Sequence, residues 1–457
     1  MELRTNATTR RRLSRAGLLV GVLAAVFALA GCGSSRHSAP APSGRPTATT
    51  ECGTNSGRGC APTRQRVDLA TPSFSHPTEI TNPLFPISRL RTTVLLGHVG
   101  GKPFRTETTL LPGTRTVTWR GRPVRVLLSQ YLAYLDGRIT EVALDRYAQA
   151  DEGSVWYLGE DVFDYENGTV SATEGTWLAG REGPAAMIMS AHPKVGHVYR
   201  PENAPGIVFE EVKVKSVGTT VDGPRGPVHG AIVAHELHAD GTTEDKVFAP
   251  GYGEFRTAGG GDLEALALAV PTDVVGGSVP PALYKLTIGG MALLESARIR
   301  DWEKAAAIHR HLTAAASSVL AGGPPPLIKA RLHGTLGALA KAMKSRKTAR
   351  VTQAAIDVWQ SALDLELRYL PVSEINQRRF ELWTQQLRVH AAAKNLGGVT
   401  GDVAVLEWIR DRFADTLDPA QRRELDLRLR DLRAAADARN LPAAADHAAR
   451  LASFLRV

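Results

Sequence analysis

The stretch Val208-Phe209-Glu210-Glu211-Val212-Lys213-Val214-Lys215 decides the fold class, because apolar and charged side chains alternate along most of it. Alternation with a period of two predicts a β-strand that buries one face. Residues 124–132 are rich in Val, Leu and Tyr, and they predict a second strand that is buried on one face and partly on the other. We therefore expect a sheet around both stretches.

Turn signals recur at short intervals on either side of these strands. The predicted turns are Leu111-Pro112-Gly113, Asp136-Gly137, Asn167-Gly168, Asp222-Gly223 and Asp240-Gly241. Many hairpin-linked strands without helices between them favour an antiparallel sheet. The sequence predicts an all-β domain over residues 76–271, folded as a barrel or half-barrel.

The composition changes after the Gly- and Pro-rich residues 275–281, from where Ala, Leu and Arg dominate. Two apolar stripes at helical spacing run through residues 351–370, which predicts a central helix that is buried on two sides. Asp418-Pro419-Ala420-Gln421 combines an N-cap, a proline at the first helical position and a capping-box glutamine. We predict a linker over residues 272–290 and an all-α, up-and-down bundle of six or seven helices over residues 291–457.

Length and composition exclude several classes of protein. The chain has 457 residues, of which 43% are hydrophobic, and a formal net charge of +9. These values predict two or three folded domains. No apolar run reaches the roughly 20 residues that a membrane-spanning helix needs. By sequence, residues 32–280 carry a net charge of −4 and residues 281–457 carry +9, but Arg alternates with Asp and Glu near the C-terminus. We interpret that pattern as a solvated helix face and predict no nucleic-acid binding.

Residues 1–31 have the pattern of an export signal, in which five Arg residues precede a run of 15 apolar residues at 16–30. The run closes on Leu29-Ala30-Gly31-Cys32, which resembles the lipobox of bacterial lipoproteins. The resemblance implies that Cys32 is diacylated, with palmitate-type chains, and becomes the new N-terminus. A protein with two or three acyl chains would be stably anchored to the cell membrane, facing outside the cytoplasm. A plain secretory signal with an incidental cysteine is the alternative.

The residues around this signal leave the export route open. Thr9-Arg10-Arg11-Arg12-Leu13 loosely resembles a twin-arginine signal, so either general secretion or export of a folded protein is consistent with it.

Residues 32–75 contain too few apolar residues to fold and predict a disordered tether. Cys52 and Cys60 lie within it, and close thiols outside the cytoplasm predict a disulfide. Zinc would need two more ligands, and only His76 is near.

Several stretches between residues 80 and 257 resemble a widespread family of secreted bacterial β-domains. The stretches are Asn82-Pro83-Leu84-Phe85-Pro86-Ile87, Trp156-Tyr157-Leu158-Gly159-Glu160-Asp161, Tyr165-Glu166-Asn167-Gly168, Thr173-Glu174-Gly175-Thr176-Trp177-Leu178-Ala179-Gly180, Lys194-Val195-Gly196 and Ala249-Pro250-Gly251-Tyr252-Gly253. The resemblance implies an exported β-domain, and it brings neither an established activity nor catalytic residues. The architecture is also similar to the half-barrels of lipoprotein carriers and to lipocalins.

Candidate metal ligands are few. Met187, Met189 and His192 offer two thioethers and an imidazole, which suit copper(I), although methionines more often fill gaps in a core. The acidic residues at 160–166 could ligate calcium or simply flank a hairpin. His235 and His238 are three residues apart in a strand-like context, so they should point to opposite faces and not form a zincin site.

The helical region offers only histidines and carboxylates as ligands. His390 continues a core stripe and is interpreted as a boundary residue, and facing-helix carboxylates such as Asp357, Glu366, Asp402 and Glu407 could complete a site with it. No nucleophile elbow and no phosphate-binding glycine loop occurs in the sequence.

These observations favour a non-catalytic role. We predict an anchored extracytoplasmic lipoprotein whose β-domain binds an apolar or envelope-derived ligand and whose helical bundle contacts a partner, such as an envelope protein. The alternatives are an extracytoplasmic copper- or zinc-binding protein and an envelope scaffold without a small ligand.

Overall fold

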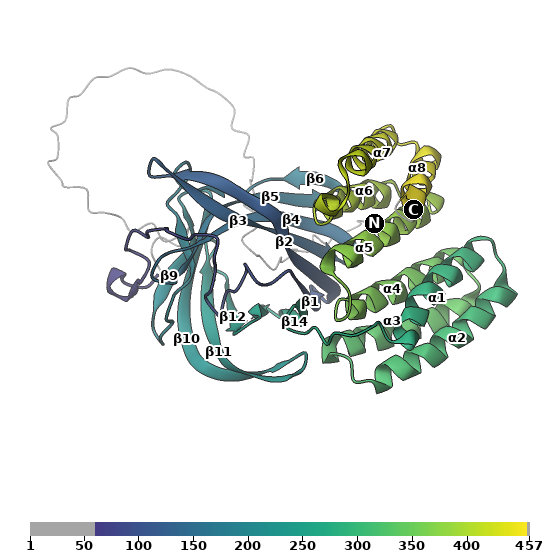
Figure 1. Ribbon diagram of the computed structural model, residues 1–457, viewed down its shortest axis with the longest axis horizontal. Coiled ribbons are helices and arrows are strands. Elements are labelled where there is room, and N and C mark those ends of the chain that lie inside the picture. The colour runs from purple at the N-terminus through teal and green to yellow at the C-terminus, as the bar shows by residue number, and fades with distance from the viewer. Residues whose placement is uncertain (1–59, 455–457) are drawn as a thin grey trace, which may run out of the picture.

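A computed structural model describes residues 60–454. The predicted signal peptide, Cys32, Cys52 and most of the predicted tether lie outside these residues. In the described part of the chain, a large β-sheet is followed by eight α-helices (Figure 1). The β-then-α order predicted from the sequence is therefore confirmed.

The sheet has 14 antiparallel strands in the order β6-β5-β4-β3-β2-β1-β14-β13-β12-β11-β10-β9, with β7 and β8 both paired to β5. It is open but strongly curved, like a half-barrel (Figure 1). The strands are β1 (Thr92–Val99), β2 (Lys102–Trp119), β3 (Arg122–Leu135), β4 (Arg138–Gln149), β5 (Val155–Glu166), β6 (Thr169–Ala172), β7 (Trp177–Leu178), β8 (Ala186–Met189), β9 (Val198–Ala204), β10 (Val208–Gly223), β11 (Gly226–His238), β12 (Thr243–Ala249), β13 (Gly253–Gly259) and β14 (Asp262–Val270).

The helices lie on one side of this sheet (Figure 1). They are α1 (Pro281–Arg298), α2 (Trp302–Ala321), α3 (Pro326–Ser345), α4 (Thr348–Glu366), α5 (Val372–Ala392), α6 (Leu396–Arg410), α7 (Pro419–Asp437) and α8 (Leu441–Phe454). As the two apolar stripes predicted, α4 is central and packs against α1, α3 and α5. The predicted capping box at Asp418 is present at the start of α7.

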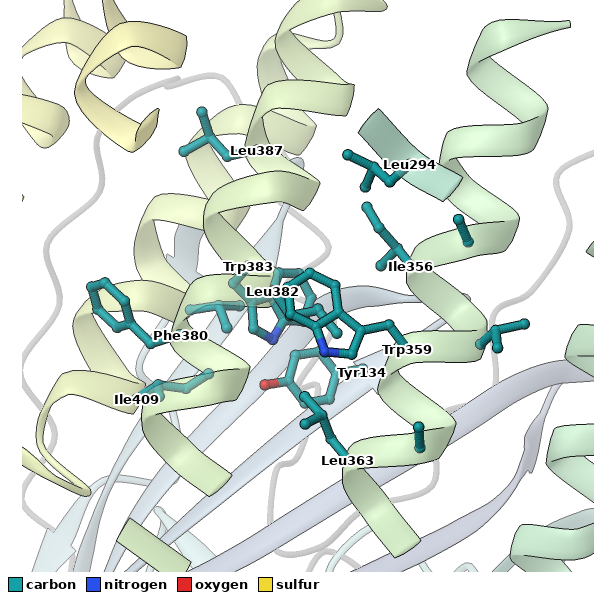
Figure 2. Close-up of a cluster of buried hydrophobic side chains, with 14 of the residues drawn as sticks. Tyr134, Leu294, Ile356, Trp359, Leu363, Phe380, Leu382, Trp383, Leu387 and Ile409 are labelled. Atoms are coloured by element: carbon teal, nitrogen blue, oxygen red, sulfur yellow. The ribbon is translucent and has the colours of Figure 1, made fainter. Parts of the chain in front are cut away.

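The two faces of the sheet belong to two different hydrophobic cores. One face packs against the helices, and its residues in the shared core include Val94 of β1, Leu132 of β3, Val142 of β4 and Leu268 of β14. Figure 2 shows the centre of that core, where Trp359 of α4 and Trp383 of α5 lie near Tyr134 of β3. Tyr134 and Trp383 stack with ring centroids 5.4 Å apart. The opposite, concave face encloses a separate core of aromatic and aliphatic side chains.

A β-turn fits tightly against the N-terminus of α6. Asn167 and Gly168 form the β5–β6 turn with φ values of +52° and +83°, which is typical of a type I′ hairpin turn. A Cβ atom on Gly397 would lie 2.8 Å from the carbonyl oxygen of Asn167. The backbones of the sheet and of α6 therefore approach too closely for any side chain between them.

We expect the substitution Gly397→Ala to destabilise the protein by about 1–3 kcal/mol, because the added methyl group must push the turn away from α6. Gly337→Ala is the matched control, since it lies inside α3 with no atom within 4 Å of the added carbon. The control should gain about 0.5–1 kcal/mol from helix propensity. Urea unfolding of both variants measures the difference, and equal effects would contradict the close contact.

Several boundaries differ from the sequence-based prediction. Leu111-Pro112-Gly113 is not a turn, because β2 continues through it with a bulge between Leu110 and Thr114. The first helix begins at Pro281, so most of the predicted linker over residues 272–290 is helical, and the bundle has eight helices instead of six or seven. The predicted tether is also too long at its C-terminal end. Ala61 donates its N–H to Glu211, and Asp68 accepts one from Arg200, so residues 60–75 lie against the sheet.

Candidate functional site

The concave face of the sheet carries an unusual number of buried acids. Side chains alternate along each strand, so Val212 and Val214 on β10 and Ile232 and Ala234 on β11 reach the inner core. Acidic side chains continue these inward rows. The buried carboxylates of the inner face are Asp145, Glu160, Glu202, Glu210, Glu236 and Glu244, each at most 5% exposed.

The strand register places these acids directly opposite one another. The cross-strand pairs are Asp145 with Glu160, Glu202 with Glu210, and Glu236 with Glu244. Like charges at opposed positions of an antiparallel pair destabilise a sheet. Three such pairs around one small space indicate that the space accommodates positive charge.

Three of the side chains form a compact ligand set. Glu210, Glu236 and His238 each offer one donor atom, and these atoms all lie within 4.8 Å of one another. The Nδ1 atom of His238 lies 3.5 Å from Glu210 Oε1 and 3.9 Å from Glu236 Oε1. Two carboxylates and one imidazole are a usual donor set for a divalent metal ion. We call Glu210, Glu236 and His238 the acidic triad.

Two side chains supply positive charge inside this space. The ammonium group of Lys246 lies 2.6 Å from Glu236 Oε1 and 3.4 Å from Glu244 Oε1. His238 is the second, with its Nε2 atom 3.8 Å from Glu244. Two cationic side chains cannot neutralise six buried carboxylates, so protons or a bound cation must supply the remaining positive charge.

Glu202 has the least compensation of the six acids. Its side chain is 1% exposed and faces the cavity, and neither oxygen receives a hydrogen bond from a donor in the part of the chain that the structure describes. Leaving a buried carboxylate without a donor is costly. Taken alone, its hydrogen bond with the neighbouring Glu160 raises the pKa of Glu202 and lowers that of Glu160, which makes a protonated Glu202 the donor.

The titration of these groups follows from their burial and mutual repulsion. Burial and the nearby Asp145 raise the pKa of Glu160 to about 8, and burial together with Glu210 raises the pKa of Glu236 to the same value. Burial and Glu160 hold the pKa of Glu202 well above its usual range. In Glu210 the effect of burial is outweighed by Lys246 and His238, which lower its pKa to about 2. The cavity thus stores protons near neutral pH.

The size of the cavity limits what it can bind. The space between the acids, Tyr157 and Tyr199 has a volume of about 40 Å³, whereas a cavity that holds one water molecule needs about 10–15 Å³. A neighbouring apolar pocket, bounded by Phe85, Leu90 and Tyr252, measures about 30 Å³. Drug-sized and lipid ligands need about 300–1,000 Å³. The interior therefore has room for an ion and not for an organic ligand.

The metal ligands predicted from the sequence lie in two different environments. Met187 and Met189 are buried in the inner hydrophobic core, where Met189 Sδ accepts a hydrogen bond from Tyr199, whereas His192 is exposed. The copper site therefore stays a prediction. The short strand β8 pairs with β5 and places both thioethers among apolar neighbours.

Two other predictions about histidine and acids are better supported. His235 and His238 do point to opposite faces: His235 is partly exposed and its Nδ1 atom lies 2.8 Å from Asp245, while His238 joins the acidic triad. Of the acidic run at 160–166, Glu160 faces the cavity, and Asp161 pairs with Arg146 on the other side.

Cys60 is disulfide-bonded, and its partner lies outside the described residues. The predicted pairing with Cys52 stays a prediction.

The helical carboxylates do not assemble a metal site around His390. The Nδ1 atom of His390 lies 2.7 Å from Asp402. Burial raises the pKa of Asp402 to about 6. Glu366 pairs with Arg378 instead, and Glu407 pairs with Arg433.

Sequence reasoning missed the acidic triad, because its members come from two strands that are brought together by register. The signal that could have found it is the spacing Glu236-x-His238, which places a carboxylate and an imidazole on one face of a predicted strand.

Comparison with known proteins adds no family or relative to these observations. No protein-family model matches the chain, and no curated protein matches it. The resemblance of residues 80–257 to secreted β-domains therefore stays a prediction. Among the helices of residues 60–454, none combines the length and the apolar composition that crossing a bilayer requires.

Proposed function

We propose that this protein is a non-catalytic, membrane-anchored binding protein of the extracytoplasmic space, and that its β-domain holds a divalent metal ion. The observation that carries the proposal is the acidic triad, set in a cavity with the uncompensated Glu202. The anchor and the compartment are supported by the sequence Leu29-Ala30-Gly31-Cys32. An ion at the triad would replace the protons that the buried carboxylates otherwise retain.

Zinc fits the donor atoms best. Imidazole nitrogen together with carboxylate oxygen is a common zinc set, whereas Ca²⁺ and Mg²⁺ favour oxygen ligands alone. Copper(I) prefers thioethers and thiolates, and the two methionine sulfurs lie in the apolar core. The cavity of about 40 Å³ also favours an ion over the apolar ligand that the sequence suggested.

We expect the metal-free protein to bind one Zn²⁺ ion in isothermal titration calorimetry, and to release protons as it does so. The substitutions Glu210→Gln, Glu236→Gln and His238→Gln should each weaken binding by about 10–100-fold or more, as loss of supporting groups alone does in metal sites. Parallel titrations with Mn²⁺ and Ca²⁺ test the choice of ion.

His235→Gln is the matched control, because His235 lies on the same strand three residues away and faces outward. Its variant should bind Zn²⁺ as the unmodified protein does. The proposal fails if none of the three ions binds, or if the His235 and His238 variants lose affinity equally. Circular dichroism establishes that each variant is folded.

A further inference from the structure

A long stretch of the helical region contains no acidic residue. Between Glu303 and Asp357 the sequence has neither Asp nor Glu, and it has nine Lys and Arg residues. The structure places this stretch on α2, α3 and the first half of α4 (Figure 1). Helices of soluble proteins normally intersperse both signs of charge, so an uninterrupted positive stretch indicates an interaction surface.

One face of α3 concentrates this charge. Lys329, His333, Lys341 and Lys344 are all exposed and recur at spacings that keep them on one side of the helix. The opposite side carries the buried residues of α3, which are Ile328, Leu332, Thr335, Leu339 and Ala342. The basic side of α3 therefore points directly away from the core.

The charge continues past the end of this helix. Arg346 and Lys347 are exposed at the turn between α3 and α4, where Arg346 has a φ of +48°, and Arg350 is exposed in the first turn of α4. We call Lys329, Lys341, Lys344, Arg346, Lys347 and Arg350 the basic face.

No residue of the basic face is ion-paired within residues 60–454, whereas three half-buried arginines of the later helices are paired with acids. Arg378 pairs with Glu374, Arg428 with Glu424, and Arg433 with Glu407. By sequence, residues 281–350 carry a net charge of +9 and residues 351–457 carry none. The whole net positive charge of the helical region thus resides on α1–α3, the turn after α3 and the first turn of α4.

Small residues lie between the lysines on this side of α3. Gly334 and Gly337 have no atom within 4 Å of where a Cβ would be, so this part of the helix is open to solvent. Ala330 and Ala338 are also exposed there. Long basic side chains around a low, smooth helix surface allow close contact with a flat anionic layer.

We propose that the basic face docks onto an anionic phospholipid surface. Residues 303–358 contain no Phe, Tyr or Trp, so the stretch lacks the stacking residues of single-stranded nucleic-acid sites. Each Lys or Arg near an anionic bilayer contributes about fivefold in affinity, which corresponds to about 1 kcal/mol. The inference is independent of metal binding, and it does not require the anchor at Cys32.

The test measures cosedimentation of the chain with lipid vesicles, in a Cys32→Ser background that removes the expected lipidation. Vesicles that mix phosphatidylglycerol with phosphatidylcholine should bind the protein at low salt and release it at high salt, whereas pure phosphatidylcholine vesicles should not bind it. The triple variant Lys329→Gln, Lys341→Gln, Lys344→Gln should bind about 100-fold more weakly, at about fivefold per charge.

Arg423→Gln, Arg430→Gln, Arg450→Gln is the matched control. It removes the same charge from exposed positions on α7 and α8, and its binding should change less than about threefold. The proposal is overturned if the two triple variants weaken binding equally, or if mixed vesicles bind no better than phosphatidylcholine alone. Binding to duplex DNA, with none to the mixed vesicles, would also overturn it.

Discussion

Replacing Glu107 with glutamine is expected to lower the free energy of unfolding by about 3–5 kcal/mol, because it breaks a buried ion network between the sheet and the helices. Glu107 lies on β2 and is 2% exposed. It contacts Arg105 of its own strand at 2.7 Å, Arg412 beyond the end of α6 at 2.5 Å and Arg379 of α5 at 3.3 Å. The side chains of Arg379 and Arg412 are fully buried.

Loss of the Glu107 charge should cost more stability than loss of a single ion pair, because Glu107 compensates three arginines. Asp364 of α4 is the only other acid among these contacts in the described residues, and it pairs with Arg105 and Arg379. Without the Glu107 charge, three buried guanidinium groups share one carboxylate. Although burial raises its pKa, Arg379, Arg105 and Arg412 hold the pKa of Glu107 well below the usual range. Its stabilising contribution should therefore be lost only at strongly acidic pH.

Glu374→Gln is the control for this experiment. Glu374 is 41% exposed in its side chain and pairs with Arg378 one turn away on α5. Exposed pairs of this kind contribute about 0.3–0.5 kcal/mol. Urea unfolding near neutral pH compares the two variants. If they lose the same stability, the network does not hold the helices on the sheet.

Local signals in the sequence predicted the local structure well. Asn167-Gly168 forms the expected hairpin turn, and Asp418 caps α7 as expected. The alternation at residues 208–215 marks a real strand, β10. Each of these features depends on residues a few positions apart, so neighbouring side chains contain the necessary information.

Features that depend on distant residues were not predictable. Glu107 meets Asp364 through a shared arginine, although more than 250 positions separate them in the chain. Leu111-Pro112-Gly113 has the composition of a turn, but pairing with β3 on both sides makes it a bulge. The burial of Met187 and Met189 was likewise not predictable, because the sequence does not show that β8 pairs with β5 and faces an apolar core.

The acidic cavity depends both on neighbouring residues and on residues far apart in the chain. Strand alternation predicts that Glu236 and His238 share a face, but only the register of β10 against β11 brings Glu210 opposite His238. The register likewise creates the like-charged pairs, which oppose folding of the sheet. A sheet optimised for stability alone would place apolar residues there, and departures of this kind are expected at functional sites.

The stability of the metal-free protein should fall as the pH rises from about 5 to about 8, by about 1.4 kcal/mol per pH unit for each raised carboxylate. Glu160 and Glu236 have folded pKa values of about 8 and would titrate near 4.3 when unfolded, so the folded protein binds more protons over this interval. Their contribution is fully present below the unfolded pKa and is lost as the pH passes the folded one. His238 acts in the same direction: burial lowers its pKa, but the hydrogen bond to Glu210 together with the charges of the nearby acids raises that pKa to about 9.

Urea unfolding in the presence of a chelator, repeated across this pH interval, measures the slope. Glu160→Gln should reduce the slope of unfolding free energy against pH by the contribution of one carboxylate, about 1.4 kcal/mol per pH unit. Asp161→Asn is the matched control, because Asp161 is the next residue, is 37% exposed in its side chain and pairs with Arg146 outside the cavity. Saturating Zn²⁺ should flatten the slope in the unmodified protein, because the ion takes the place of the retained protons. Stability that stays level or rises between these pH values would mean that the cavity acids are not protonated in the folded state.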